Sequence, residues 1–197
     1  MNTGKISSKN LKWAFWFTVL ATVAVYIAIV GWSAPKISGY ADGLVIFDLR
    51  PTGYGFQEAE AFLAALTDEG RMFYLSVQHR LDTLYPALLA VTTIWAFLLL
   101  LPRNGLALFA PLLPIVAMTF DYLENLAVAV MLHSGTQSLT AEIVSHASRY
   151  SVLKSGFTTA SMSLLLLLVL IKVYRNWRAK RSRTLNRPGF GGDHQLK

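Results

Sequence analysis

The chain has 197 residues, of which 54% are hydrophobic and only 15% charged, and its mean hydropathy is +0.44. This balance is too apolar for a soluble domain of the same length, and it indicates an integral membrane protein. The sequence contains no cysteine, which excludes disulfides, thiol redox chemistry and thiolate metal sites. It also lacks a P-loop, a dinucleotide-binding fingerprint and a nucleophile elbow.

Four runs almost free of charge are long enough to cross a hydrocarbon core of ~30 Å, which takes roughly 20 apolar residues. They lie at about 12–32, 83–102, 105–132 and 153–172. The sequence therefore predicts an all-α fold, a four-helix transmembrane bundle that forms one integral membrane domain over residues 1–180. Pro111 and Pro114 fall in the third run and predict a kink there. A basic, disordered cytoplasmic tail is expected over residues 181–197.

The long connection between the first two spans is predicted to contain an ordered outer loop and an amphipathic helix. The stretch FDLRPTGYGF carries turn signals at its Arg-Pro and Thr-Gly pairs. In residues 56–67, apolar side chains recur at helical spacing opposite Glu58 and Glu60. This extracytoplasmic helix is therefore expected to lie either on the membrane or over the mouth of the bundle.

Basic residues are concentrated on one side of this topology. The amino-terminal segment, the turn that holds Arg103 and the tail carry twelve basic residues and a single acid. By the positive-inside rule that side is cytoplasmic, which predicts a multi-pass protein of the bacterial inner (plasma) membrane with both termini in the cytoplasm. The basic tail is expected to contact membrane lipids and no nucleic acid. The sequence leaves homo-oligomerisation open.

Ionisable side chains occur within three of the predicted helices. Asp121 and Glu124 stand three residues apart, so they project from one face of the third span. Measured from the cytoplasmic ends of their helices at ~1.5 Å per residue, Asp82, Asp121 and Lys154 all lie at a depth of roughly 26–30 Å. Exposing such a group to lipid costs on the order of 2.5–3.5 kcal/mol. We therefore expect these groups to meet inside the bundle, near its outer side.

The predicted site combines these ionisable groups with polar residues on the same helix faces. Catalytic roles are assigned to Asp82, Asp121, Glu124 and Lys154. Substrate contacts are assigned to Arg71, Tyr74, Gln78, Tyr85 and Asn125. No recognised metal spacing is present, so no metal ligand is assigned, and the sequence leaves the cofactor unknown. A hard metal site that adds His79 and His146 to the carboxylates stays an alternative.

Three classes of function fit such a site. Acid/base or metal-assisted chemistry on a lipid-like substrate is favoured, because the polar groups stop at one depth and the second and fourth spans are apolar below it. A small proton-coupled transporter would use the same acids as a relay. In a non-enzymatic assembly or interaction subunit, the acids and Lys154 would form a structural ion-pair network.

Five segments between about residues 45 and 160 form a pattern of their own: FDLRPTGYGF, GRMFYL, LDTLYP, DYLEN and LKSGF. Together they resemble the pattern of an uncharacterised family of bacterial four-span integral membrane proteins. The resemblance implies the four-span architecture and points to the same acids and lysine, but it names no reaction. His79 stands where that pattern more often has glutamine, which disfavours a metal-ligand role for it.

Overall fold

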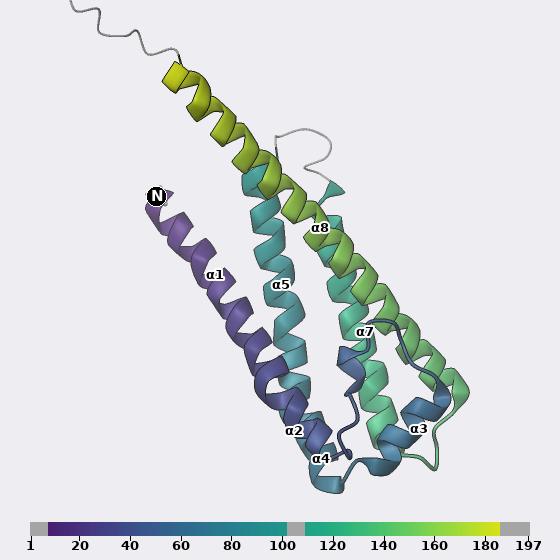
Figure 1. Ribbon diagram of the computed structural model, residues 1–197. Coiled ribbons are helices and arrows are strands. Elements are labelled where there is room, and N and C mark those ends of the chain that lie inside the picture. Colours follow the sequence, from purple (N-terminus) through teal and green to yellow (C-terminus); the bar gives the residue numbers. More distant parts are fainter. Residues whose placement is uncertain (1–7, 102–108, 186–197) are drawn as a thin grey trace, which may run out of the picture.

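The computed structural model describes residues 8–101 and 109–185, and all regular structure in these two ranges is helical (Figure 1). Among the described residues, four helical segments are long and apolar enough to cross a membrane: Lys9–Gly39, Asp68–Leu100, Leu112–Ser134 and Ala141–Arg181. The chain thus fits a multi-pass membrane protein, and the predicted all-α bundle is confirmed.

Two of the spans are composite, because a π-helical turn joins two α-helices. In chain order the elements are α1 (Ser8–Ala28), a π-helical turn (Ile29–Ser33), α2 (Ala34–Gly39), a 3₁₀ turn (Phe47–Leu49), α3 (Phe56–Ala65), α4 (Asp68–Phe73), a second π-helical turn (Tyr74–Gln78), α5 (His79–Leu100), α7 (Leu112–Ser134) and α8 (Ala141–Leu185). The helix of α8 therefore includes the start of the predicted tail, and residues 186–197 lie outside the described ranges. π-helical turns are uncommon in helices and often mark functional positions.

The third span differs from the sequence prediction at its beginning. Helix α7 starts at Leu112, with Pro111 as its N-cap residue and Pro114 in its first turn. A proline in the first turn removes no helical hydrogen bond, since the first N–H groups of a helix have no partner inside it. The helical run is broken at Ala110 and Pro111, between the helical residues Phe109 and Leu112, so the disturbance expected at the prolines is present as a break in the helix.

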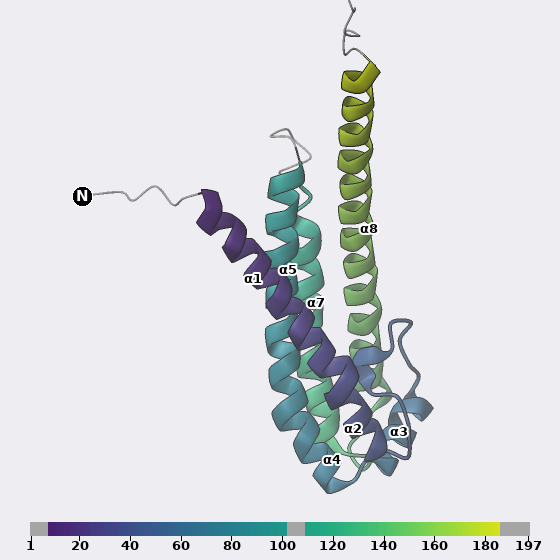
Figure 2. The same ribbon diagram turned by 60° about the vertical axis from the view of Figure 1, so that its left-hand side comes forward.

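Short helices gather at one end of the bundle, which we call the capped end. Helices α2, α3 and α4 and the loop between α2 and α3 lie together there (Figures 1 and 2). The amino-terminal end of α1 and the carboxy-terminal end of α8 lie at the opposite end in both views. The first and the last described helices therefore have their outer ends on the same side of the bundle.

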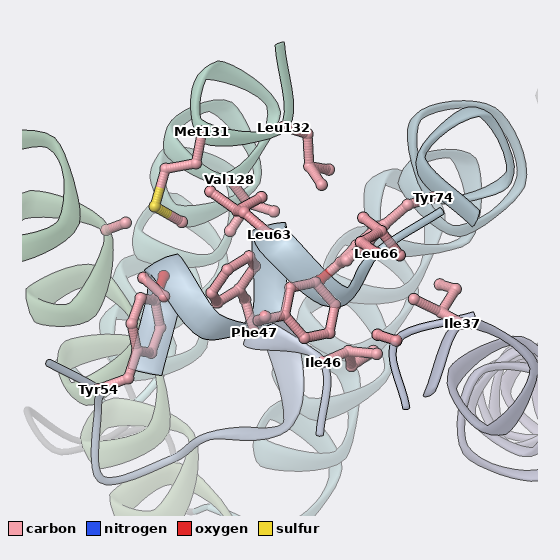
Figure 3. Packing of buried hydrophobic residues seen from close by; sticks show 14 of the residues in the cluster. Ile37, Ile46, Phe47, Tyr54, Leu63, Leu66, Tyr74, Val128, Met131 and Leu132 are labelled. Atoms are coloured by element: carbon pink, nitrogen blue, oxygen red, sulfur yellow. The ribbon is translucent and has the colours of Figure 1, made fainter. Parts of the chain in front are cut away.

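A dense apolar cluster holds the capped end together (Figure 3). Phe47 of the loop and Phe62 of α3 are both 0% exposed, and their rings meet edge to face with centroids 4.7 Å apart. Val128, Met131 and Leu132 of α7 pack against the same cluster. The amphipathic helix predicted for residues 56–67 thus covers the mouth of the bundle, because its apolar face is buried in a cluster with residues of α7 and α8.

The opposite end is packed much less tightly. Its buried cluster consists of Phe97, Leu101 and Ala110, with three leucines of α8 against it, Leu164, Leu165 and Leu168. Many other apolar side chains there are exposed on the helix surfaces, as for Leu166 and Leu170. Helices in a bilayer need no such cover, because lipid tails are as apolar as the side chains.

Candidate functional site

The polar layer predicted from the sequence forms between α7 and α8. The Lys154 ammonium contacts the Glu124 carboxylate directly and lies 3.8 Å from that of Asp121. Glu124 is fully buried, and its other carboxylate oxygen accepts a hydrogen bond from the Ser151 hydroxyl. The ion pair and hydrogen bond together compensate for a carboxylate that would otherwise be very costly inside a membrane protein.

Helix α5 adds Asp82 to the same region. Its side chain is 8% exposed, and its Oδ2 accepts a hydrogen bond of 2.7 Å from the Gln78 amide. Gln78 is the last residue of the second π-helical turn and is fully buried. The two residues are four positions apart, so Gln78 lies directly above Asp82 on the inner face of the helix and holds the carboxylate in place.

A proline in α5 explains why Asn125 stands beside the acids of α7. Pro86 has no N–H, so the carbonyl of Asp82, four residues earlier, lacks its helical donor. The Asn125 amide donates to that carbonyl at 2.8 Å, and Tyr122 donates to the carbonyl of Thr83 at 3.0 Å. The LDTLYP and DYLEN segments are therefore complementary, because Asn125 of the second binds the carbonyl freed in the first and Tyr122 binds the neighbouring carbonyl of Thr83.

A fourth carboxylate, Asp48, reaches the site from the loop between α2 and α3. It lies in the 3₁₀ turn, and its Oδ2 accepts a hydrogen bond of 2.6 Å from the Tyr74 hydroxyl. Asp48 was not among the predicted site residues, because nothing in the sequence except its place in the FDLRPTGYGF segment pointed to it. Ser151 was also missed, because a serine on a spanning helix is more often bonded to its own helix.

Three contacts fix the loop that carries Asp48. Arg50 donates two hydrogen bonds to the Val45 carbonyl, at 3.1 and 2.6 Å. Gly53 adopts a φ of 81°, and a Cβ at this position would come within 2.6 Å of Ser148 Oγ on α8. The N–H of Tyr54 donates to the same hydroxyl at 2.9 Å. Glycine is thus required where the loop turns against α8, and the loop is held as part of the site wall.

The aromatic ring that follows this glycine closes the polar layer toward the cap. Tyr54 is buried, and its ring stacks near Phe47 with centroids 4.9 Å apart. Burial, and after it the charges of Glu124 and Asp48, raise the pKa of the Tyr54 phenol above its ordinary value. The phenol is therefore neutral at physiological pH, and it adds no charge to the acids beneath it.

A cavity of about 280 Å³ lies beside these groups. Its polar wall is formed by Asp48, Asp82, Asp121 and Lys154, together with Tyr85. The remaining lining residues are Tyr26, Ile29, Val30, Leu49, Pro51, Leu89, Ser155, Thr158 and Thr159. Several lining residues are exposed: Tyr26 at 49%, Val30 at 37% and Leu49 at 39%. The cavity therefore reaches the surface beside α1, the π-helical turn that follows it and the loop that carries Asp48.

A second void of about 10 Å³ lies on the other side of Asp121, between α5, α7 and α8. Thr93 and Ser161 line it and are each 1% exposed, and the hydroxyl of Ser161 has no hydrogen-bond partner among the described residues. The void has the size of a single water molecule. Polar character thus extends only a short way below Asp121.

The predicted substrate-binding residues occupy three different kinds of position. Tyr85 lines the cavity, whereas Tyr74 and Gln78 stand behind its wall and bind Asp48 and Asp82. The Asn125 amide binds a backbone carbonyl and does not line the cavity. Arg71 donates to the carbonyl of Leu132 at 2.5 Å and joins α4 to the end of α7, away from the cavity lining.

Two of the histidines, His133 and His146, contact groups of their own helices. His146 is 3.9 Å from Glu142 on its own helix, and His133 contacts the carbonyl of Ala129 one turn earlier. Within the part of the chain that the structure describes, no three His, Asp or Glu side chains come together as a group that could hold a metal ion. The buried carboxylates are instead engaged with lysine, serine, glutamine and tyrosine side chains.

Comparison with protein-family models, with curated proteins and with solved structures finds no match for this chain.

Proposed function

We propose that the chain binds a lipid-like amphiphile in the 280 Å³ cavity and performs acid/base chemistry on its polar end. One observation carries this proposal: a single cavity has charged groups on one wall and apolar side chains on another. An amphiphile would place its polar end against Asp82, Asp121 and Lys154. Its chain would lie against Ile29, Val30 and Leu89, where apolar burial contributes about 0.8 kcal/mol per CH₂ group.

Exposed lining residues of the first span support a ligand that arrives from the membrane. Tyr26 of α1 and Val30 of the following π-helical turn line the cavity and are 49% and 37% exposed. Both belong to the segment Lys9–Gly39, which is long and apolar enough to cross a membrane. Access from this side favours a substrate that partitions into lipid.

The acid/base part of the proposal rests on Asp121 and Lys154. Both line the cavity, and they stand 3.8 Å apart. In this proposal the Asp121 carboxylate accepts a proton from the ligand, and the Lys154 ammonium, held by Glu124, keeps the carboxylate ionised before the transfer. Asp82 and Asp48 bind the polar end, and Gln78 and Tyr74 position them.

The alternative of proton-coupled transport has less support. A transported proton would need polar groups along the whole bundle. Beyond Thr93 and Ser161, the interior is formed by Phe97, Leu101 and Ala110 with leucines of α8. Among the described residues, the polar side chains near Asp121 thus favour a single cavity over a continuous polar path across the membrane.

We further propose that the capped end faces outward and that the chain lies in the bacterial inner membrane. The start of α1 and the end of α8 both lie at the end of the bundle opposite the cap (Figure 2). These segments hold most of the basic residues that the positive-inside rule assigns to the cytoplasm. Reporter fusions at Arg103 and after Arg181 should both report cytoplasm, and an external signal from either would reverse the orientation.

A photoreactive probe tests the binding proposal. Full-length protein in maltoside micelles is labelled with an uncharged long-chain alcohol that carries a diazirine on its chain. Peptides with Ile29, Val30 and Leu89 should be labelled, and Thr158→Phe, which fills the cavity, should abolish that labelling. The matched control is Ala160→Phe, an exposed position of α8 that does not line the cavity. Equal labelling in the two variants would reject the cavity as the binding site.

The chemistry requires a separate experiment. Lipids extracted from cells that lack the protein are compared by mass spectrometry with those from cells that express the wild type, Asp121→Asn or Thr158→Phe. The same lipid species should accumulate in the deletion and in both variants. If Asp121→Asn restores the wild-type lipid profile, Asp121 transfers no proton in the reaction, and the acid/base proposal fails.

A further inference from the structure

We infer that the amphiphile bound in this cavity carries a positively charged head group, such as an ammonium. This inference deepens the proposed function and rests on it, because it concerns the ligand of the same cavity. It follows from the number and pairing of the charges in the wall, from the burial of Asp82 and from the aromatic rings at the rim.

Negative charge exceeds positive charge in the wall of the cavity. Three carboxylates, of Asp48, Asp82 and Asp121, line it together with one ammonium, of Lys154. That ammonium is already engaged, since it contacts Glu124 and lies 3.8 Å from Asp121. Within residues 8–101 and 109–185, neither Asp48 nor Asp82 forms a salt bridge. Two acids of the wall therefore lack a cationic partner.

The protein supplies only part of the hydrogen bonding and counter-charge that these two carboxylates need. Asp82 is 8% exposed and lines the cavity, and its neutral neighbour Gln78 supplies one hydrogen bond but no charge. Asp48 accepts one hydrogen bond from Tyr74, while its Oδ1 is buried with no hydrogen-bond partner among the described residues. A buried carboxylate without a counter-charge is unfavourable, and a cation in the adjacent space would relieve both.

Aromatic rings stand where such a cation would enter. Tyr26 of α1 and Tyr85 of α5 both line the cavity, and their ring centroids are 5.7 Å apart. The faces of tyrosine rings attract ammonium groups, most strongly where water is excluded. The apolar residues Ile29, Val30 and Leu49 continue the lining toward the rim, where the chain of the amphiphile would lie. Charge, aromatic rings and apolar surface thus match a long-chain ammonium.

The inference is tested with four probes on the purified full-length protein in maltoside micelles. Dodecyltrimethylammonium, dodecanoate and dodecanol share one chain length and differ in charge, and tetramethylammonium is the head group alone. Binding is measured as the rise in Tm with probe concentration. The wild type should bind dodecyltrimethylammonium about tenfold or more tightly than dodecanoate or dodecanol, because the two unpaired carboxylates attract a cation. It should also bind it more tightly than tetramethylammonium, which has the charge but lacks the chain that the apolar lining would bury.

Three variants link this preference to the acids of the wall. Asp82→Asn and Asp48→Asn each keep the oxygen that accepts from Gln78 or Tyr74 and remove one charge, so each should weaken binding of dodecyltrimethylammonium about tenfold. Glu60→Gln, at an exposed carboxylate of α3 outside the cavity, should leave binding unchanged. Asp48 lies in a loop, so its variant serves as the test if Asp82→Asn does not fold.

The outcomes separate this inference from the proposed function. If the three long-chain probes bind equally and Thr158→Phe blocks them all, the amphiphile site stands and the inference of a cationic ligand is overturned. Stronger binding of dodecanoate would overturn it as well. If no long-chain probe binds, both proposals fail. Binding of tetramethylammonium as tight as that of its long-chain counterpart would show a soluble ammonium ligand and would overturn the amphiphile.

Discussion

The capped half of the bundle and the opposite half differ in the groups that they bury and in how densely they are packed. The capped half contains the acids, the lysine and a freed backbone carbonyl, and it surrounds them with a cluster in which Phe47 and Phe62 are 0% exposed. The opposite half has few polar groups inside and leaves leucines such as Leu166 on its surface. The difference shows that dense protein packing is present where charges must be kept from lipid, and is light where lipid itself suffices.

The strongest test of this comparison is the removal of the lysine in the polar layer. Lys154→Met should lower the free energy of unfolding by about 3–5 kcal/mol, because Glu124 would be left fully buried without its cationic partner. Unfolding in mixed detergent micelles provides the measurement. Adding Glu124→Gln to Lys154→Met should recover part of the loss.

The control is Lys172→Met, at an exposed position of α8 in the opposite half, which should change stability by less than about 0.5 kcal/mol.

Truncation of one apolar side chain in each half compares their packing directly. Phe62→Ala should cost about 3–5 kcal/mol, because it leaves a cavity among fully buried neighbours of the cap. Leu166→Ala, at a side chain that is 60% exposed on α8, should cost less than about 1 kcal/mol in the same micelles. Similar losses in the two variants would contradict the difference in packing.

The contact between Asn125 and α5 should have a smaller effect that depends on Pro86. Asn125→Leu should cost about 1–3 kcal/mol, because the Asp82 carbonyl would be left without a donor. In a Pro86→Ala background the N–H of residue 86 can bind that carbonyl, so Asn125→Leu should cost clearly less there. A double-mutant cycle measures the difference, and the same cost in both backgrounds would show that Asn125 does not act through this carbonyl.

The smallest expected effect concerns the loop that carries Asp48. Gly53→Ala should cost about 1–2 kcal/mol, because the residue has a φ of 81° and its Cβ would meet Ser148. Binding of the amphiphile should weaken along with stability, since Asp48 would be displaced. Gly156→Ala on α8, where a Cβ meets nothing within 4 Å, should be neutral or stabilising by about 0.5–1 kcal/mol. A neutral Gly53→Ala would mean that the loop is not fixed by its turn against α8.

Much of the polar layer could be predicted because helical geometry is regular. The spacing of Asp121 and Glu124 and the depth of Lys154 in its span were sufficient to expect their contact, which the structure shows. Roles inside the layer were harder to predict. Asn125 lies on the same helix face as the acids but binds the carbonyl of Asp82. Arg71 binds the carbonyl of Leu132 and so joins α4 to the end of α7. Periodicity gives the face of a helix on which a side chain lies, and it does not specify the atom that the side chain meets.

By itself the amino-acid sequence determined the four spans and the level at which three of them bring ionisable groups together. It could do so because the cost of charge in lipid acts on every residue and leaves a periodic pattern. The tertiary structure decided that Asp48 joins the site, that the helix of residues 56–65 covers the bundle mouth and that one cavity is lined jointly by α1, the Asp48 loop, α5, α7 and α8. Those features depend on how an irregular loop packs, and its path is set by contacts between residues far apart in the chain, such as Gly53 with Ser148.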